Sequence, residues 1–265
     1  MGKDGREIAK ENEARVLRAL HRFGWLRTRD LASLLWQPRG KNPVGAPTMQ
    51  PPVATASGLR MAQRTLRRLL NTRQVLSSQA PDGSLVYALS EAGARSLERL
   101  GVPTAASGKD LVRRFSAAQF RHRTIANQIA IVGILAGFRV SSEREIAQDR
   151  WLGGAKGIEG KKPDVLLQSN GCAWWIEVER SRRSAKDYTK LLEWLRIVGH
   201  DAFRQSGSIL LGSGLRWERI IFICTPSFCL KLINDLKSAG WKDNAINRLL
   251  SFESSLYSFK DILFE

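Results

Sequence analysis

The dipeptide Asn170-Gly171 places the strongest constraint on the fold of this 265-residue chain, because Asn-Gly is the clearest short signal for a two-residue β-hairpin turn. The segments on either side, 164–168 and 172–179, are rich in apolar residues, and we expect both to be strands. A two-residue turn fixes the register of the two strands, so the facing residue is known at each position.

Three carboxylates meet on one face of this expected hairpin. In its register Asp164 faces Glu177, and Lys162 faces Glu179. Facing residues, and residues two apart on one strand, share a face of the sheet, so the three carboxylates should converge there with Lys162 beside them. Like charges opposite each other are destabilising, and a hard cation that takes oxygen ligands, Mg²⁺ or Mn²⁺, would compensate them. The simpler alternative is an exposed strand face with scattered acidic residues.

The net charge of the chain indicates what kind of partner it binds. The chain has 42 Lys and Arg against 25 Asp and Glu, a formal net charge of +17. This balance is typical of proteins that bind nucleic acid and unusual for enzymes of small metabolites. The longest apolar run, 129–138, is about ten residues and too short to span a bilayer. With a polar N-terminus and three cysteines without a close pair, the sequence predicts a cytoplasmic protein without membrane contact, disulfide framework or structural zinc.

Residues 1–100 have the element order of a winged helix-turn-helix domain. Thr28 and Ser90 are the expected N-caps of its second and fourth helices. The expected elements are helices over 8–22, 29–35 and 57–72, strands over 75–78 and 85–89, and a helix over 91–100. Residues 37–56, with five prolines and two glycines, predict a long irregular loop, which we expect to pack on DNA or become ordered when DNA binds.

Charge on the third expected helix points to double-stranded DNA. Residues 31–81 contain no Asp or Glu and seven basic residues. A solvated helix face normally mixes signs, whereas a recognition helix needs cations near phosphates and base edges. The alternative is a winged helix that only binds protein, and RNA is disfavoured because we see no exposed aromatic platform. Five basic residues lie on or beside this helix: Arg60, Arg64, Arg67, Arg68 and Arg73.

Residues 101–112 are expected to be a linker, and residues 113–265 a second domain, which makes the whole chain a mixture of α+β and α/β structure. The order expected for the second domain is αβββαβ: a helix over 115–137, strands over 138–146, 164–168 and 172–180, a helix from 184, a strand over 219–224 and a helix over 226–239. That order resembles the core of the PD-(D/E)xK nuclease superfamily. Pro163-Asp164 and Glu177-Val-Glu179 stand where that superfamily has its motif.

The resemblance implies a metal-dependent DNA endonuclease. Asp164 and Glu177 would be metal ligands, and Glu179 a ligand or a general base. Glu143 and Glu145, two apart on the preceding expected strand, are further candidate ligands. Glu179 stands where the motif has lysine, so another residue must supply the cation. The candidates are Lys162, Arg180, Arg183, Lys186 and Lys190.

Three segments are also similar to the replication-relaxation family and the MobC-type plasmid relaxases, over about residues 10–200. They are Arg121-His122-Arg123 with Asn127, Lys162-Pro163-Asp164, and residues 176–184 leading to Tyr188. The resemblance implies nicking or relaxation of DNA at a plasmid transfer or replication origin, with other plasmid-processing proteins as partners. His122 is either a site residue or a packed core histidine. A catalytically inactive DNA-binding accessory protein is the second hypothesis, and the oligomeric state stays open.

Overall fold

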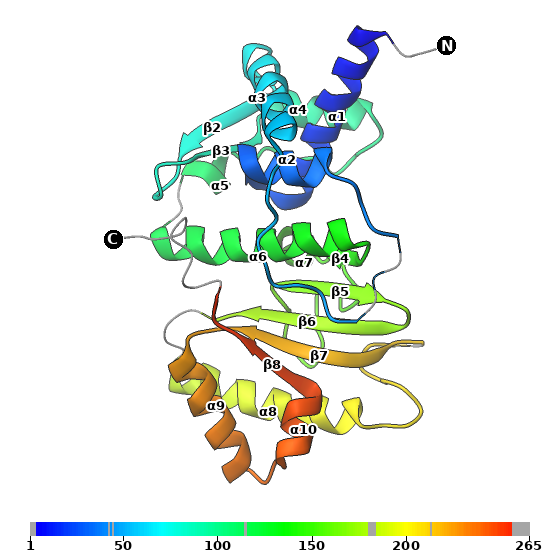
Figure 1. Cartoon of the computed structure of the whole chain (residues 1–265), viewed down its shortest axis with the longest axis vertical. Coiled ribbons are helices and arrows are strands. Elements are labelled where there is room, and N and C mark those ends of the chain that lie inside the picture. The colour runs from blue at the N-terminus through cyan, green and yellow to red at the C-terminus, as the bar shows by residue number, and fades with distance from the viewer. Residues whose placement is uncertain are drawn as a thin grey trace. The chain divides into compact units, whose positions relative to one another are not determined.

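A computed structural model describes residues 4–41, 43, 45–113, 116–179, 184–212 and 214–255. The chain is a mixed α/β protein that divides into two compact units, each with its own sheet (Figure 1). The first unit holds the residues up to Arg39 and from Pro51 to Arg121, and the second holds Gly40–Gln50 and the residues from His122 onward. Among the helices in these described ranges, none combines the length and apolar content that a bilayer crossing needs.

The first unit joins helices to a small antiparallel sheet with strand order β1-β3-β2. Helices α1, α2 and α3 pack against one another, and the β2–β3 hairpin follows them in the chain (Figure 1). Its elements are α1 (Gly5–Phe23), β1 (Trp25–Arg27), α2 (Thr28–Trp36), α3 (Ala56–Asn71), β2 (Val75–Gln79), β3 (Leu85–Leu89), α4 (Glu91–Arg99) and α5 (Lys109–Arg113).

The positions expected for the helices and strands of this unit are largely confirmed. Gly24 ends α1 at a φ of 83°, and the Ser90 side chain caps α4 by accepting from the amide of Gly93. Strand β1 was not expected, and Thr28 is the first residue of α2 rather than its cap. The cap position is Arg27, whose amide donates to Asp30 Oδ2 at 2.9 Å, so the acidic residue at the third helical position satisfies the helix start.

Arg27 is a buried cation that ties the start of α2 to the hairpin turn. Its side chain is 2% exposed, its Nε lies 3.0 Å from Asp30 Oδ2, and its Nη1 lies 3.6 Å from Asp82 Oδ2. Asp82 follows Pro81 in the turn between β2 and β3, where Gly83 has a φ of 77°. A buried charge needs such partners, because unpaired it would lose its hydration without compensation.

Residues 101–112, which the sequence predicted as a linker, lie in the first unit. Val112 of α5 is 4% exposed and belongs to a small apolar cluster with Trp25. The ring of Trp25 stacks on Phe120, with centroids 5.2 Å apart. The boundary between the two units falls inside α6 (Ala117–Ala136), because the division places Arg121 in one unit and His122 in the other.

The second unit is built on a five-stranded mixed sheet of order β4-β5-β6-β7-β8. β4, β5 and β6 are antiparallel neighbours, whereas β7 is parallel to β6 and β8 is parallel to β7. Besides α6, its elements are β4 (Arg139–Ser141), α7 (Glu143–Ala147), β5 (Val165–Ser169), β6 (Cys172–Val178), α8 (Ala185–Ala202), β7 (Arg216–Ile223), α9 (Pro226–Ser238), α10 (Asp243–Leu249) and β8 (Leu250–Glu253).

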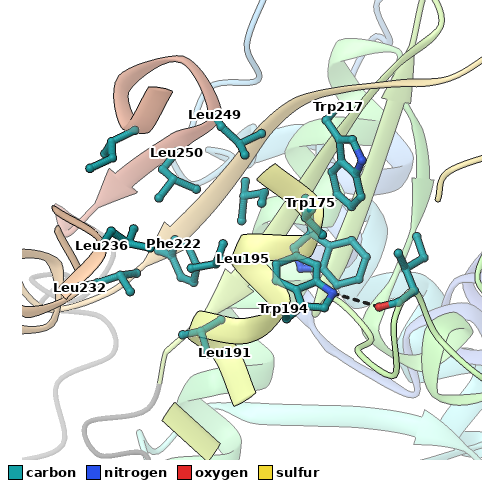
Figure 2. Packing of buried hydrophobic residues seen from close by; sticks show 14 of the residues in the cluster. Trp175, Leu191, Trp194, Leu195, Trp217, Phe222, Leu232, Leu236, Leu249 and Leu250 are labelled. Carbon is teal, nitrogen blue, oxygen red and sulfur yellow. Dashed lines mark hydrogen bonds between the residues drawn. The ribbon is translucent and has the colours of Figure 1, made fainter. Parts of the chain in front are cut away.

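One face of this sheet carries an aromatic core. Trp175 of β6 packs against Trp194 of α8 and Trp217 of β7, with ring centroids 4.8 and 5.8 Å away (Figure 2). Leucines from α8, α9 and α10 complete the cluster around Phe222 (Figure 2). The dashed line in Figure 2 is the hydrogen bond from the indole N–H of Trp194 to the carbonyl of Ile158 at 2.9 Å, which gives the polar atom of this buried ring a partner.

Helix α6 covers the opposite face. A Cβ added at Gly133 would come within 2.7 Å of the Leu167 side chain and 3.1 Å of Val140, so this glycine permits close helix-to-sheet packing. The described residues between 37 and 55 lie outside helices and strands, as expected. The amide of Gly40 donates to the carbonyl of Leu135 at 2.7 Å. This part of the loop therefore packs on the second unit's own helix.

The secondary structure of the second unit differs from expectation in two places. The strand expected over 138–146 ends at Ser141, and the residues after it form helix α7. Ser142 caps α7, and the side chain of Glu145 returns a hydrogen bond to the Ser142 amide at 2.9 Å. Helix α10 and strand β8, at the edge of the sheet, were not expected at all.

Candidate active site

The expected hairpin is present in its expected register. Asn170 and Gly171 have φ values of 50° and 71°, which both central residues of a type I′ turn require. Ser169 pairs with Cys172, and the ladder continues in step to Val165 opposite Ile176. The register therefore brings Asp164, the residue before β5, toward Glu177.

Asp164 lies just beyond the end of the ladder and is held on both carboxylate oxygens. Its amide donates to the carbonyl of Ile176 at 3.0 Å, and its Oδ2 accepts from the amide of Val178 at 2.7 Å. Oδ1 lies 3.2 Å from Nε2 of His122 on α6. Burial alone would raise the pKa of Asp164, but His122 and the Val178 amide outweigh it, so the pKa lies below its usual value. Of the two readings of His122, the structure places it at the site.

Glu177 is buried in the middle of the second unit and also has both oxygens engaged. Its Oε2 lies 2.5 Å from Nζ of Lys161, and its Oε1 accepts from the indole N–H of Trp175 at 2.6 Å. The residue is 3% exposed. Burial raises the pKa of Glu177, and the charges of Asp164 and Glu179 raise it further, against the opposing effect of Lys161.

Lys161 is the cation that the described part of the chain brings to Glu177, and it was not among the residues expected there. A tight turn places it, because Ile158 pairs with Lys161 across Glu159 and Gly160, whose φ values are 50° and 73°. Its Nζ also lies 5.5 Å from the ring centroid of Trp194. Gly160, with a φ of 73°, is the one signal of this turn in the sequence, because glycine adopts positive φ readily.

Lys162, by contrast, points elsewhere. Its Nζ lies 2.6 Å from Oδ1 of Asp149, and both side chains are more than one third exposed. The expected pairing of Lys162 with Glu179 is wrong because the ladder stops at Asp164, and the preceding Pro163 has no N–H to extend it. The pairing of the two strands therefore follows the expected register as far as Asp164 and does not extend to Lys162.

Glu179 continues from β6 and is almost fully buried, with an exposed fraction of 3%. Its amide donates to the carbonyl of Ile223 at 2.8 Å, which keeps it beside the end of β7. Burial, the neighbouring Cys229 and the charge of Glu179 raise the pKa of the Cys224 thiol to about 12. Burial and the hydrogen bond to Asp235 likewise raise the pKa of Tyr188, with a smaller contribution from Glu179. Neither group is therefore an activated nucleophile near neutral pH.

The other expected site residues divide into several groups. Lys186 and Lys190 lie exposed on the first turns of α8. Lys190 lines a cleft of about 450 Å³ together with Lys161 and Trp194, so this cleft leads to the cation at the site. Arg180 and Arg183 lie outside the described residues.

Glu143 and Glu145 occupy helix α7 rather than a strand, so the expected alternation that would aim both at the site does not apply. Arg123 of α6 binds Glu143 through two contacts, Nε to Oε2 at 3.2 Å and Nη2 to Oε1 at 3.4 Å. Glu145 serves the Ser142 cap described above. The structure thus gives both carboxylates structural partners.

The carboxylate oxygens of Asp164 and Glu177 are ligands of the type that a hard divalent cation prefers. Each carboxylate oxygen has two lone pairs, so an oxygen that accepts one hydrogen bond retains a second for a metal. Within the described ranges, no three His, Cys, Asp or Glu side chains form a group arranged to hold an ion. Lys161 supplies part of the positive charge that the sequence pattern led us to expect from a metal.

A second candidate surface lies on α3 in the first unit. After its first residue, Ala56, its exposed side chains are polar or cationic, and most recur every three or four residues, which places them on one face of the helix. They are Ser57, Arg60, Arg64, Arg67 and Asn71, with Gln63 beside them. We call these six residues the α3 polar face.

Two of the expected DNA-binding arginines differ from the rest. Arg68 is turned away from the α3 polar face, and its Nε lies 2.7 Å from Oε1 of Glu13 on α1. Arg73 is exposed but follows the helix, in a left-handed conformation with a φ of 55°. Arg60, Arg64 and Arg67 have no ion pair within the part of the chain that the structure describes.

Comparison of this chain with protein-family models, curated proteins and solved structures finds no match.

Proposed function

We propose that this chain is a DNA-binding protein whose second unit is a metal-dependent nuclease that nicks or relaxes double-stranded DNA. The observation that carries the proposal is the meeting of Asp164, Glu177 and Lys161 at one end of the β5–β6 hairpin. Two carboxylates and a cation, largely removed from water, are the groups that phosphodiester hydrolysis needs.

The order of elements supports this proposal. Helix α6, the antiparallel strands β4, β5 and β6, helix α8 and the parallel strand β7 follow the αβββαβ order expected of a PD-(D/E)xK-like core. Asp164 and Glu177 stand at the motif positions of that core. The resemblance to plasmid relaxases suggests a plasmid transfer or replication origin as the DNA site.

Each residue of the proposed active site would have a separate role in the reaction. Asp164 and Glu177 would hold Mg²⁺ or Mn²⁺, which when bound supplies Lewis-acid polarisation of a phosphate oxygen. Lys161 would stabilise negative charge that develops on the phosphate, in place of the lysine that Glu179 replaces. His122, beside Asp164, holds that carboxylate in position and can carry a proton.

The first unit would supply DNA affinity through the α3 polar face. Arginine, glutamine and asparagine are the side chains that read base edges in the major groove, and arginine also binds phosphates. The order of helices α1, α2 and α3 followed by the β2–β3 hairpin supports a winged helix-turn-helix for this unit. A protein-binding winged helix is disfavoured, because the exposed face of α3 carries arginines instead of apolar side chains.

A nicking assay tests the enzyme. The substrate is supercoiled DNA that carries the region around this protein's own gene, with Mg²⁺ or Mn²⁺ or with a chelator. We expect metal-dependent conversion to open circle by the wild type, and loss of at least about a hundredfold in Glu177→Gln, the range in which removal of one electrostatic catalytic group falls. Glu98→Gln, an exposed residue at the end of α4, is the matched control and should nick at the wild-type rate.

A catalytically inactive DNA-binding accessory protein is the second candidate. One observation favours it: all four oxygens of Asp164 and Glu177 already have partners in the chain. If the wild type binds the DNA but does not nick it with either metal, and Glu177→Gln binds equally well, the accessory role replaces the enzyme.

A further inference from the structure

A basic cleft of about 400 Å³ opens in the second unit where β7 begins. Four arginines line it, and Glu218 is the one carboxylate among its described lining residues. The arginines come from three places in the chain: the segment just after α8, strand β7 and helix α10. They are Arg204, Arg216, Arg219 and Arg248.

This cleft is separate from the candidate active site. Arg216 contacts Cys172 at the start of β6, whereas Glu177 lies five residues further along the same strand. At about 3.3 Å per residue, the two positions are roughly 17 Å apart along the strand. The cleft and the carboxylates therefore lie at opposite ends of β6, and one cannot be part of the other.

Three of the four guanidinium groups of the cleft contact neutral partners. Arg219 donates from Nη1 to the carbonyl oxygens of Asn247 and of Leu250, the latter at 3.3 Å. Arg216 donates from Nε to the Cys172 sulfur at 3.2 Å, and the guanidinium of Arg248 lies 5.2 Å from the ring centroid of Phe203. Carbonyls, a thiol and a ring fix the positions of these groups without neutralising their charge.

The chemistry of such a cleft selects one class of ligand. Fixed guanidinium groups match the geometry of phosphate oxygens and bind them through paired hydrogen bonds. A concave wall with several cations also concentrates anions more strongly than scattered surface arginines do. We propose that this cleft is a phosphate-binding site, occupied either by a phosphodiester of DNA bound outside the active site or by a free polyphosphate.

Two binding measurements on the full chain test the proposal and separate the two sources. The first titrates tripolyphosphate at constant ionic strength, and the second measures affinity for a labelled DNA duplex as a function of salt concentration. Arg204→Ala and Arg248→Ala remove cleft cations whose side chains are exposed, so both variants should keep the wild-type unfolding midpoint. Arg139→Ala, on an exposed position of β4 outside the cleft, makes the same change in net charge and is the control.

If a free polyphosphate is the ligand, its dissociation constant should rise roughly tenfold in each cleft variant and stay unchanged in the control. If DNA is the ligand, each cleft variant should lower the slope of log affinity against log salt by about 0.9, and the control should not. The proposal is overturned if neither ligand distinguishes the cleft variants from Arg139→Ala. Neither measurement depends on nicking, so failure of the proposed enzyme would leave this result unaffected.

Discussion

Removal of the Lys161 side-chain charge should lower the free energy of unfolding of the second unit, by an amount that depends on pH. Glu177 is 3% exposed, its partner Lys161 has a side chain that is 17% exposed, and the two charged atoms lie 2.5 Å apart. Breaking a buried ion pair by removing one partner costs about 3–5 kcal/mol, because the other charge stays buried. The partial exposure of Lys161 favours the lower end, so Lys161→Met should lose about 3 kcal/mol near pH 8.

The pH dependence follows from the sign of the Glu177 shift. Burial raises the pKa of Glu177 above its ordinary value of 4.5, and removal of Lys161 should raise it further. A carboxyl whose folded-state pKa is raised costs stability above that pKa and costs none below the unfolded value. The deficit of Lys161→Met should therefore shrink as the pH falls from 8 toward 4.5, where Glu177 takes up a proton in the folded state.

Urea unfolding followed by tryptophan fluorescence measures this deficit, because Trp175, Trp194 and Trp217 report on the second unit. In a thermal scan, about 3 kcal/mol corresponds to a fall in midpoint of roughly 6–12 °C for a unit of this size. Lys162→Met is the matched control, since its exposed pair with Asp149 should contribute only about 0–1 kcal/mol. An equal loss in both variants, or a deficit that does not change with pH, would refute the reasoning.

Three further changes test other parts of the molecule. Arg64→Ala should lower the salt slope of DNA affinity by about 0.9, and Arg68→Ala by clearly less because its guanidinium is already ion-paired; equal slopes would contradict this. Gly93→Ala should cost more than about 3 kcal/mol in urea unfolding, because a Cβ there would lie 2.1 Å from the carbonyl oxygen of Gln74; a neutral result would mean that α4 packs differently. The pKa of Asp164 lies below its ordinary value of 3.8, so its stabilising effect is present above that value and is lost as the pH falls through the folded-state pKa. When the two proteins are compared at matched stability near neutral pH, acid unfolding followed by circular dichroism should begin at higher pH in the wild type than in Asp164→Asn, which has no carboxylate to protonate at this position; coincident curves would argue against a depressed pKa.

The hairpin that carries the candidate site could be predicted because its signals are local. Asn170-Gly171 adopts the positive φ values that the turn needs, and the register then follows by counting from Ser169 opposite Cys172. The cap at Ser90 was found for the same reason, since its side chain contacts a backbone amide three residues away.

The cation at the site could not be found by the same counting. The ladder ends at Asp164, and Lys162 leaves the sheet before it could face Glu179. Lys161 reaches Glu177 through a separate turn, and the match between two segments sixteen residues apart is set by tertiary packing rather than by periodicity.

The remaining differences come from competing local signals. Residues 138–146 alternate in a way that suits a strand, but Ser142 and Glu145 form a capping box that starts a helix within that range. Strand β8 is four residues long and pairs in parallel with β7, so it has neither the length nor a hairpin turn to mark it. The burial of Arg27 could not be predicted either. Its two acidic partners, Asp30 and Asp82, lie far from each other in the sequence, so nothing local shows that both contact Arg27.

The most direct test of the proposed active site compares two adjacent lysines. Supercoiled DNA is incubated with Mn²⁺ and with wild type, Lys161→Met or Lys162→Met, well below the unfolding midpoint of each protein and at equal DNA occupancy. Lys161 lies 2.5 Å from Glu177, whereas Lys162 is paired with Asp149, so the two changes remove the same charge from different places. We predict that nicking falls at least about a hundredfold in Lys161→Met and less than about threefold in Lys162→Met. Equal nicking by the two variants, or wild-type nicking by Lys161→Met, would contradict the assignment of this cation to the site.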